Sequence, residues 1–581
     1  MRGDLEFKSI PRLVRTAAAR HGDREAVVEG RTRVGCEQLA ARIERAAAGC
    51  LAAGVEAGDR VAVWAPNTLD WIVSALGAVT AGAVLVPVNT RLRGAEAVQV
   101  LARTRAKLLF VTGTFLGTSY VAALRRAAGA TQDAGAGAGA AAGAGVGLGV
   151  DLGDAGGDAG GGTGGRRGKG RDRRAGVPLP GLPHLREAVV LAEDAPSGFR
   201  TWKEFLAAGD AVPGWAVRAR ANAVGPDAPS DIVFTSGTTG EPKGVVVTHA
   251  QSLRTFAAWS DLAGLRRGDR YLIVNPFSHT FGYKAGVLAC LMRGAVMVPQ
   301  AVFAVDAVLA HLTAERITVL PGPPTLLRAL LDHPASAAGG LSSLRLVVTG
   351  AADVDPRLVE RLRDEAGIPT VLTAYGMSEA TGVVTMCRRD DRAEVVAGTS
   401  GRALPDTEVK VVGAGGKALP PGRPGEVLVR GYQVMKGYFE DPRATAETVD
   451  VDGWLHTGDI GVLDGEGNLR ITDRIKDMFV AGGFNVYPAE VERMLAGHPG
   501  IAEAAVVGVP DKRLGEVGKA FVVRRGGGPA VTAEELIAWA RHEMAAYKVP
   551  REVEFVPVLP RNASGKVVKR GLRQAGGMTA G

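Results

Sequence analysis

The segment TSGTTGEPKG, residues 235–244, lies between two short apolar stretches, residues 232–234 and 245–247. Within ten residues it holds three glycines, four hydroxyl side chains and one lysine. Glycines let backbone N–H groups approach an anion, hydroxyls donate further hydrogen bonds, and Lys243 supplies a compensating charge. We interpret the segment as a phosphate-binding loop. The residues that we expect to contact phosphate are Thr235, Ser236, Gly237, Thr238, Thr239, Gly240 and Lys243.

Two other interpretations of this segment are less consistent with its residues. The G-x-x-x-x-G-K spacing of a Walker loop is absent, and the β-branched residues 245–247 predict a strand after the loop, not a helix. A plain turn needs only two to five residues and no such set of donors. The segment therefore predicts a phosphate-binding loop that joins two strands.

Four later motifs follow in a fixed order: YGMSE at residues 375–379, TGD at 457–459, DRIKD at 473–477 and NASGK at 562–566. Together with residues 235–244 they resemble the signature motifs of the adenylate-forming superfamily, which comprises acyl- and aryl-CoA ligases, luciferases and the adenylation domains of peptide synthetases. The resemblance extends over nearly the whole chain. It implies ATP-dependent conversion of a carboxylic acid to an acyl-adenylate, followed by transfer to CoA with release of AMP and pyrophosphate.

The composition is that of a soluble globular protein with more than one domain. A chain of 581 residues is too long for a single core, and 46% of its residues are hydrophobic while 22% are charged. The formal net charge is +8, but residues 166–174 alone contribute +5, because six basic residues there outnumber one aspartate. The excess charge is therefore local, and we expect ATP and CoA, not nucleic acid, as the anionic partners.

The distribution of cysteines and apolar residues bears on the cellular location. Four cysteines lie far apart with no C-x-x-C pair, which argues against a disulfide framework or a metal site and favours a reducing cytoplasm. Residues 1–11 lack the apolar core of a secretion signal, and no run of about 20 strongly apolar residues suggests a transmembrane segment. We expect a cytoplasmic protein, and a homodimer is left open.

Strands and helices alternate along the first part of the chain. Apolar patterns predict strands at 61–64, 84–88 and 108–112, with helices at 39–51, 71–81 and 96–104. This alternation is typical of a parallel, doubly wound sheet. Further along we expect a strand at 188–191, a helix that begins near residue 201, and a helix at 249–260 with Thr248 as its N-cap.

The C-terminal part has a different pattern. Residues 488–495 and 533–544 predict helices, and residues 504–509, 520–523 and 553–556 predict strands of a small sheet. We therefore expect an α/β fold with a large N-terminal AMP-binding domain of doubly wound sheets, residues 1–475, and a small mobile α+β C-terminal domain, residues 476–581.

Residues from about 130 to 178 form an insertion of low complexity. They consist mainly of Gly, Ala and Asp and contain no aromatic residue, so they cannot bury enough apolar surface to offset their ordering entropy. We predict a disordered surface insertion. Its basic end, residues 166–174, could contact nucleic acid or an anionic surface, but a solvated linker is the interpretation that we favour.

The resemblance implies a nucleotide site built from several motifs. It places Tyr375 against the adenine, Ser378 at phosphate, and Glu379 at Mg²⁺, which is a hard cation that takes one or two carboxylates together with phosphate oxygens. It also places Asp459 and Arg474 at the ribose hydroxyls. The remaining residues implied on the nucleotide side are Gly376 and the small residues of the adenine-side turn, Gly350, Ala351 and Ala352.

The same resemblance places one wall of the acyl pocket at residues 275–286, with His279, Phe281 and Gly282 against the substrate. No acidic residue occurs between Tyr271 and Val305, which argues against an amino-acid substrate. The sequence of this segment most resembles the corresponding segment of bacterial fatty-acyl and steroid-ring-propionate CoA ligases. That His279 is an ordinary core or surface histidine is left open.

The C-terminal motifs complete the implied machinery. Lys566 matches the catalytic lysine of the family, Lys476 matches the pivot between the domains, and Gly482 and Gly483 match a loop that lines the CoA channel. Two alternatives stay open: a fatty acyl-AMP ligase that loads a carrier protein, and a non-catalytic nucleotide-binding scaffold that uses the insertion as an interaction arm. Lys566 argues against the scaffold, because binding alone does not require it. The exact acid and any modification of Lys566 are not specified by the sequence.

Overall fold

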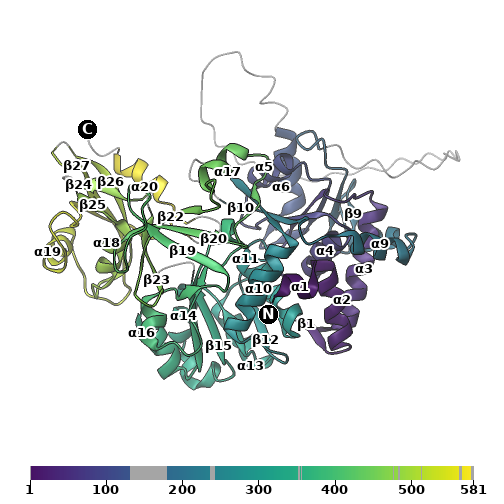
Figure 1. The fold of residues 1–581 in the computed structure, drawn as a ribbon, viewed down its shortest axis with the longest axis horizontal. Helices are drawn as coiled ribbons and strands as arrows, with labels where there is room; N and C mark the ends of the chain where they lie inside the picture. The colour runs from purple at the N-terminus through teal and green to yellow at the C-terminus, as the bar shows by residue number, and fades with distance from the viewer. Residues whose placement is uncertain are drawn as a thin grey trace, which may run out of the picture.

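The computed structural model describes residues 2–130, 179–235, 242–350, 354, 356–474, 477–481, 484–511, 513–561 and 566–577 (Figure 1). The predicted insertion, apart from residue 130, lies outside this part of the chain. In Figure 1 the C-terminal elements, α18 to α20, lie at one end of the molecule, away from the N-terminal helices α1 to α4.

An eight-stranded sheet carries the phosphate segment toward one edge, on its second and third strands. Its strand order is β21-β11-β10-β4-β3-β5-β8-β9, and β3, β4, β5 and β8 are parallel neighbours, as the alternating pattern predicts. Crossover helices connect these strands, so the predicted doubly wound architecture is confirmed. The strands are β3 (Arg60–Trp64), β4 (Val84–Pro87), β5 (Leu108–Val111), β8 (Glu187–Val190), β9 (Arg200–Thr201), β10 (Pro229–Thr235), β11 (Lys243–Thr248) and β21 (Gly437–Tyr438).

A nine-stranded sheet carries the predicted acyl-pocket segment and the adenine-side motifs. Its order is β18-β17-β16-β15-β14-β12-β13-β1-β2, and β12 to β16 are parallel. The strands are β1 (Glu25–Glu29), β2 (Thr32–Gly35), β12 (Arg270–Ile273), β13 (Val296–Pro299), β14 (Val319–Pro321), β15 (Leu346–Gly350), β16 (Thr370–Tyr375), β17 (Thr385–Met386) and β18 (Arg402–Ala403). A short hairpin, β6 (Thr114–Phe115) with β7 (Thr118–Ser119), stands apart.

One hydrophobic core joins the two large sheets. Buried side chains of α4, α10 and η1 pack in it together with residues from both sheets. The helices of this part are α1 (Gly3–Phe7), α2 (Ile10–His21), α3 (Cys36–Ala52), α4 (Leu69–Thr80), α5 (Gly94–Thr104), α6 (Tyr120–Ala130), α8 (Trp202–Gly209), α9 (Gly214–Ala223), α10 (His249–Ala263), α11 (Thr280–Gly282), η1 (Tyr283–Leu288), α12 (Ala289–Arg293), α13 (Val305–Ala314), α14 (Pro324–Leu331), η2 (Ser336–Gly340), α15 (Pro356–Glu360), η3 (Arg361–Glu365), η4 (Ser378–Ala380), α16 (Ala393–Gly398) and α17 (Pro442–Thr448).

Helix α10, which follows the phosphate segment, shows how local sequence sets these elements. The Thr248 hydroxyl accepts a hydrogen bond from the Gln251 backbone N–H at 3.2 Å, as the predicted N-cap requires. The helix ends at Gly264, which adopts the left-handed conformation with φ of 67°. Both ends of α10 are therefore fixed by the sequence.

Two smaller sheets form the C-terminal third. A four-stranded sheet contains β19 (Thr407–Val412), β20 (Gly425–Gly431), β22 (Leu455–Leu463) and β23 (Leu469–Arg474). The last sheet contains β24 (Phe479–Ala481), β25 (Phe484–Val486), β26 (Ile501–Asp511), β27 (Gly515–Arg524) and β28 (Glu552–Phe555), and the helices nearby are α18 (Pro488–Ala496), α19 (Ala533–Glu543) and α20 (Lys569–Gly577). The predicted small α+β domain is confirmed, while its boundary at 475/476 falls outside the described residues and stays a prediction.

The segment 480–487 differs from the sequence expectation. We predict a glycine-containing loop there, but β24 and β25 pair as antiparallel strands, with Val480 opposite Asn485. The reason is its apolar, aromatic and β-branched content on both sides of the two glycines, which suits a hairpin. Gly482 and Gly483 themselves, and the predicted pivot Lys476, lie outside the described residues.

Candidate active site

The phosphate segment is held at both ends by an antiparallel ladder. Strands β10 and β11 pair in register up to Thr235 opposite Lys243, and β10 also pairs with β4 in the middle of the sheet. The prediction that this segment joins two strands is therefore confirmed. Its predicted phosphate ligands Ser236, Gly237, Thr238, Thr239 and Gly240 lie outside the described residues.

Lys243 and Glu379 meet at one tyrosine. The Lys243 Nζ atom lies 4.9 Å from the centroid of the Tyr438 ring, and the Tyr438 hydroxyl donates a hydrogen bond to Glu379 Oε1 at 2.9 Å. Tyr438 is on β21, which pairs with β11 through Val245. Burial, and then the Glu379 carboxylate, raise the pKa of the Tyr438 hydroxyl, so it stays a donor. The structure thus brings together two of the predicted site residues that come from distant motifs.

Sequence reasoning missed Tyr438. Its only signal is its place in the short aromatic pair Tyr438-Phe439, which carries no charge and no recognisable spacing. It reaches the site because β21 adds to the edge of the sheet beside the phosphate hairpin. Such a contact depends on sheet topology and not on local sequence.

Tyr375, Asp459 and Arg474 form a second cluster. The Tyr375 hydroxyl donates a hydrogen bond to Asp459 Oδ2 at 2.6 Å, and Arg474 Nε lies 2.7 Å from Asp459 Oδ1. Asp459 and Arg474 are directly opposite in the β22–β23 ladder, while Tyr375 ends β16 of the large sheet. Burial, and then Asp459, hold the pKa of Tyr375 well above its usual value. Each carboxylate oxygen of Asp459 still has a second lone pair that a ribose hydroxyl can use.

Small residues let the backbone pack closely beside this cluster. A Cβ atom at Gly376 would lie 2.2 Å from the carbonyl oxygen of Gly382, and a Cβ atom at Gly350 would lie 2.4 Å from that of Ala374. Any larger residue at either position would collide with backbone. Ser378 begins η4 immediately after Gly376 and Met377, while Ala351 and Ala352 lie outside the described residues.

The predicted pocket wall is a tight segment that leads into α11. His279 is the N-cap of α11, and its Nδ1 accepts a hydrogen bond from the Phe281 backbone N–H at 3.2 Å. Burial, with a further contribution from the Lys566 ammonium, lowers the pKa of His279 to about 4, so its imidazole is neutral at pH 7. The Phe281 ring meets Trp259 of α10 edge-to-face at 6.4 Å, and a Cβ atom at Gly282 would lie 2.1 Å from the Pro276 carbonyl oxygen.

Asn67 holds the backbone of this wall in place. Its Nδ2 atom donates to the carbonyl oxygens of Ile273 at 3.1 Å and Asn275 at 2.9 Å, and its Oδ1 atom accepts from the Phe277 N–H at 2.8 Å. Asn67 comes from the turn between β3 and α4, so it ties the pocket wall to the other large sheet. The amide side chain uses both its donor and its acceptor groups in this clamp.

Lys566 lies on an exposed segment of the small domain. An isolated bridge between Arg561 and Val567, and a hydrogen bond from the Val568 N–H to the Pro560 carbonyl oxygen at 2.8 Å, fold this segment back on itself. The ammonium of Lys566 is within electrostatic range of His279, because it lowers the pKa of that imidazole. The structure therefore places Lys566 near the predicted pocket wall, across the domain interface.

A hydrogen bond at the end of β23 joins the two domains. Asp473 is 5% exposed, and its Oδ2 atom accepts a hydrogen bond at 2.8 Å from the Ala489 N–H in the first turn of α18. Burial raises the pKa of Asp473 to about 6. Within the small domain, Arg573 of α20 lies 3.1 Å from Asp477, just after the predicted pivot. The Asp473 hydrogen bond therefore ties the last strand of the large domain to the first helix of the small domain.

The residues present fit a magnesium ion held mainly by nucleotide. In the described part of the chain, no group of three or more His, Cys, Asp or Glu side chains gathers where it could hold a metal. Glu379 is a single carboxylate, 8% exposed, with Oε1 oriented by Tyr438. One protein carboxylate together with phosphate oxygens is the arrangement in which Mg²⁺ is commonly bound.

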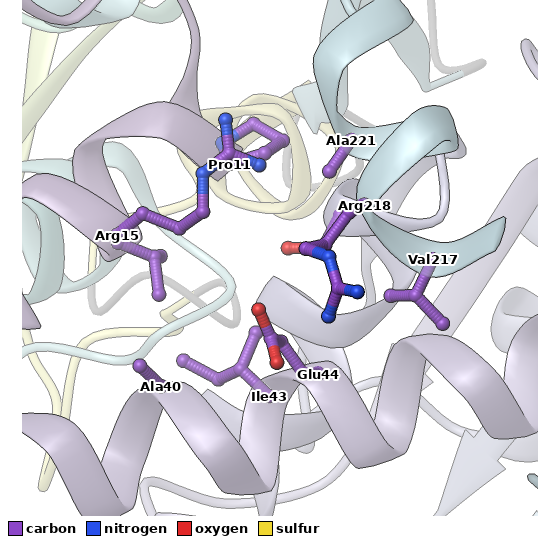
Figure 2. A pocket seen from close by; sticks show the side chains of 10 residues that line it. Pro11, Arg15, Ala40, Ile43, Glu44, Val217, Arg218 and Ala221 are labelled. Carbon is purple, nitrogen blue, oxygen red and sulfur yellow. The ribbon is translucent and has the colours of Figure 1, made fainter. Parts of the chain in front are cut away.

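Two further features of the structure bear on other kinds of site. A surface hollow between α2, α3 and α9 is lined by none of the predicted site residues; Figure 2 shows that charged side chains, Arg15, Glu44 and Arg218, line it together with apolar ones. Among the described helices, none combines the length and apolarity that a membrane-spanning segment needs.

Comparison with known proteins identifies the class to which this fold and site belong. Residues 14–439 match the AMP-binding enzyme family, and residues 490–566 match the AMP-binding enzyme C-terminal domain. The chain belongs to this family, and its enzymatic class is that of an acyl-CoA synthetase, with ATP and CoA as substrates.

Two curated ligases and one solved structure are similar to this chain over nearly its full length. It is 45% identical to the 3-[(3aS,4S,7aS)-7a-methyl-1,5-dioxo-octahydro-1H-inden-4-yl]propanoyl:CoA ligase of Mycobacterium tuberculosis, over 98% of this chain and 99% of that protein. It is 46% identical to the ligase of the same name from Rhodococcus jostii, over 97% and 98% of the two chains. The crystal structure of ATP-bound MatB from Rhodopseudomonas palustris superposes with a TM-score of 0.78 at 26% identity, over 98% and 99% of the two chains.

Proposed function

We propose that this acyl-CoA synthetase activates a propionate side chain carried on a fused-ring, steroid-derived acid. The observation that carries the proposal is the 45% identity, over nearly the full length of both chains, to a ligase whose name specifies such an acid. The predicted pocket wall supports it, because His279 is neutral and no acidic residue occurs between Tyr271 and Val305. A wall without acidic side chains and with a neutral imidazole suits a bulky apolar acid.

In the first step, the substrate carboxylate attacks the α-phosphorus of ATP and pyrophosphate leaves. Two anions must meet, so catalysis consists of charge neutralisation and in-line positioning. Lys243, oriented over the Tyr438 ring, would face the phosphates, and Lys566 would lie between the carboxylate and the α-phosphate. No general base is needed, since the carboxylate is already ionised at pH 7.

Nucleotide binding would use the second cluster. Asp459, held between Tyr375 and Arg474, would accept the ribose hydroxyls, and the ring of Tyr375 would lie against the adenine. Mg²⁺, when bound, would neutralise phosphate charge, and Glu379 is the residue that would hold it. The hydrogen bond from Tyr438 fixes one oxygen of Glu379, which leaves the other for the ion.

In the second step, the CoA thiol displaces AMP and the thioester forms. A free thiol with a pKa near 8.5 is already roughly a tenth thiolate at pH 7.5, so a modest positive potential is enough. We assign the approach of CoA to the Gly482-Gly483 segment and the pivot of the small domain to Lys476. Lys476→Pro should therefore slow thioester formation far more than adenylation, and equal loss in both half-reactions would contradict this assignment.

Two finer expectations accompany this function. A cytoplasmic location is consistent with four free cysteines, all buried and far apart in the sequence. A homodimer stays a prediction, and light scattering coupled to size-exclusion chromatography would test it by measuring the molar mass in solution.

The function is tested by pyrophosphate release from ATP and Mg²⁺ across a panel of acids, with and without CoA. The panel contains short, medium and long fatty acids, aryl acids and fused-ring propionates. We expect release that depends on a fused-ring propionate, thioester formation only with CoA, and loss of both overall activities in Lys566→Ala. Preference for a linear fatty acid would contradict the proposed substrate class. Release without any thioester would instead favour a fatty acyl-AMP ligase, and no acid-dependent release would favour the scaffold.

A further inference from the structure

The phosphate segment and the acyl-pocket wall belong to different sheets, although they must deliver groups to one reaction. The phosphate segment continues β10 and β11 of the eight-stranded sheet, while residues 279–282 lie between β12 and β13 of the nine-stranded sheet. An error of about 1 Å in their relative placement would cost on the order of 10² in the rate of a step that depends on alignment. A contact that fixes one sheet against the other near these segments would therefore affect catalysis directly.

A buried ion pair makes such a contact. Lys284 Nζ of η1 lies 2.9 Å from Asp231 Oδ1 of β10, and both side chains are 0% exposed. Asp231 precedes Thr235 on the strand that ends in the phosphate segment, and Lys284 lies within the predicted pocket wall, two residues after Gly282. The pair therefore joins the two segments through only a few residues on each side.

The neighbouring side chains orient the Asp231 carboxylate and leave it as the charge partner of Lys284. The Ser230 hydroxyl donates a hydrogen bond to Asp231 Oδ2 at 2.6 Å, which orients the carboxylate. His249 at the start of α10 lies within electrostatic range of Lys284, and burial followed by the Lys284 ammonium lowers the pKa of His249 to about 3. His249 is thus neutral and accepts a hydrogen bond from the Ile10 N–H at 3.3 Å. Asp231 is left as the charge partner of Lys284.

Stability alone does not account for this arrangement. Removing two charges from water is so costly that an apolar pair of similar size often serves stability equally well. The lysine also lies on η1, a π-helix, and single π-turns inside helices occur frequently at functional sites. The ion pair imposes a direction and a distance that an apolar contact would not impose.

We propose that Lys284 and Asp231 are positioning residues that hold the acyl-pocket wall in register with the phosphate segment. The inference rests on the proposed function, because it concerns the rate of acyl-adenylate formation. The pair touches neither substrate nor nucleotide in this role. It acts by fixing the alignment of the carboxylate with the α-phosphorus, so its removal slows the chemical step and leaves the binding of each substrate nearly unchanged.

The double variant Lys284→Met with Asp231→Leu tests this role, because it removes both charges and leaves no buried charge without a partner. Single-turnover acyl-adenylate formation is measured with the acid that the wild-type enzyme prefers, beside equilibrium binding of ATP and of the acid, and the melting temperature. We expect adenylate formation to slow by about 10- to 100-fold, with both dissociation constants within threefold of wild type. Lys519→Met is the matched control, since it removes a lysine that is 5% exposed and ion-paired on β27, and its rate should stay within twofold of wild type.

Three outcomes would overturn the proposal. They are an adenylation rate of the double variant within twofold of wild type, a loss confined to the affinity for the acid, and an equal loss in Lys519→Met. Should the double variant not fold, Ser230→Ala is the second test, because it removes the hydroxyl that donates to Asp231 Oδ2, together with its contacts to Val247 and Ser252, and leaves both charges of the pair in place. An unchanged rate in a folded Ser230→Ala enzyme would overturn the proposal as well. A wild-type enzyme that forms no adenylate with any acid would refute the proposed function, and this inference with it. The measurement on the wild-type enzyme alone distinguishes that case from a failure of this inference.

Discussion

The two lysines proposed to neutralise the same transition state are held in very different ways. Lys243 is the first residue of β11, paired in register with Thr235 and placed over the Tyr438 ring. Lys566 is exposed on a short segment of the small domain, near His279 only because the domain interface brings it there. One charge is a permanent part of the proposed nucleotide site, while the other depends on the orientation of a whole domain. This difference predicts that the two lysines act in different sets of steps.

The largest effect should come from Lys566→Ala. Loss of one preorganised electrostatic contact should slow acyl-adenylate formation by about 10² to 10³. Thioester formation from pre-formed acyl-adenylate and CoA should stay within threefold of wild type, since Lys566 is proposed to act between the carboxylate and the α-phosphate and that step forms no bond to phosphorus. Rapid-quench measurement of the two half-reactions checks this, and equal loss in both would remove the distinction between the two lysines.

Lys243→Met should slow adenylation by about 10²-fold and, unlike Lys566→Ala, should weaken ATP binding as well. The reason is that Lys243 lies at the end of a strand ladder and is present before the small domain closes. Isothermal titration with a non-hydrolysable ATP analogue gives the affinity. Unchanged ATP affinity would show that the fixed lysine, too, acts only in the transition state.

Glu379→Gln should raise the Mg²⁺ concentration needed for half-maximal adenylation by about tenfold, which is the effect of losing about 1.4 kcal/mol of binding free energy. The carboxylate is oriented by Tyr438, so the amide keeps the hydrogen bond and removes only the charge. Titration of pyrophosphate release with Mg²⁺ at fixed ATP measures it. A Mg²⁺ requirement equal to that of wild type would exclude Glu379 as the residue that holds the ion.

Tyr375→Phe should have a smaller effect, because it removes one of the two partners of Asp459 and leaves Arg474 in place. Loss of a hydrogen bond to a charged group costs about 1.5 to 3 kcal/mol at most, part of which a ribose hydroxyl or water can restore. We expect the KM for ATP to rise about threefold to tenfold with kcat nearly unchanged. Thermal unfolding with and without ATP separates binding from stability, and a variant with wild-type KM would show that Arg474 alone orients Asp459.

The smallest expected effect concerns His279. Its pKa is lowered to about 4, so the folded protein binds the proton less readily than the unfolded chain does at its ordinary value near 6.5. The stability that this group contributes is therefore complete above about pH 6.5 and is lost as the pH falls toward 4. Between pH 5.5 and 7.5, kcat/KM of wild type and of His279→Gln should show the same pH dependence. A titration near pH 6.5 that is present only in wild type would contradict the neutral imidazole.

Much of the fold was predictable because its signals are local. Apolar periodicity set the parallel strands around Val61 and Val84, and the hydroxyl of Thr248 marked the start of α10. The clusters of Tyr375 with Asp459, and of Lys243 with Glu379, come from motifs that the sequence singled out. The sequence did not predict which residues of one motif contact which residues of another.

The features that escaped prediction depend on tertiary contacts. Tyr438 enters the site because β21 pairs with β11 from a distant part of the chain. The π-helix at Tyr283–Leu288 has no recognisable sequence signature. We attribute its hydrogen-bond register to the packing of this segment, which includes Lys284, against β10 and α10. The hairpin at β24 and β25 replaced a predicted loop because pairing of apolar flanks outweighs the two glycines between them.

The Asn67 clamp sets a limit on substrate discrimination. Because Asn67 already engages the backbone groups of Ile273, Asn275 and Phe277, we expect that stretch of the predicted pocket wall to recognise a substrate mainly by shape. Shape alone separates acids that differ by one methylene by only about 10- to 200-fold, whereas a wall that hydrogen-bonds its substrate rejects an analogue without the matching group far more strongly. We therefore expect the proposed pocket to tolerate neighbouring ring sizes and side-chain lengths, so that the acids available to the enzyme would contribute to which thioester it makes.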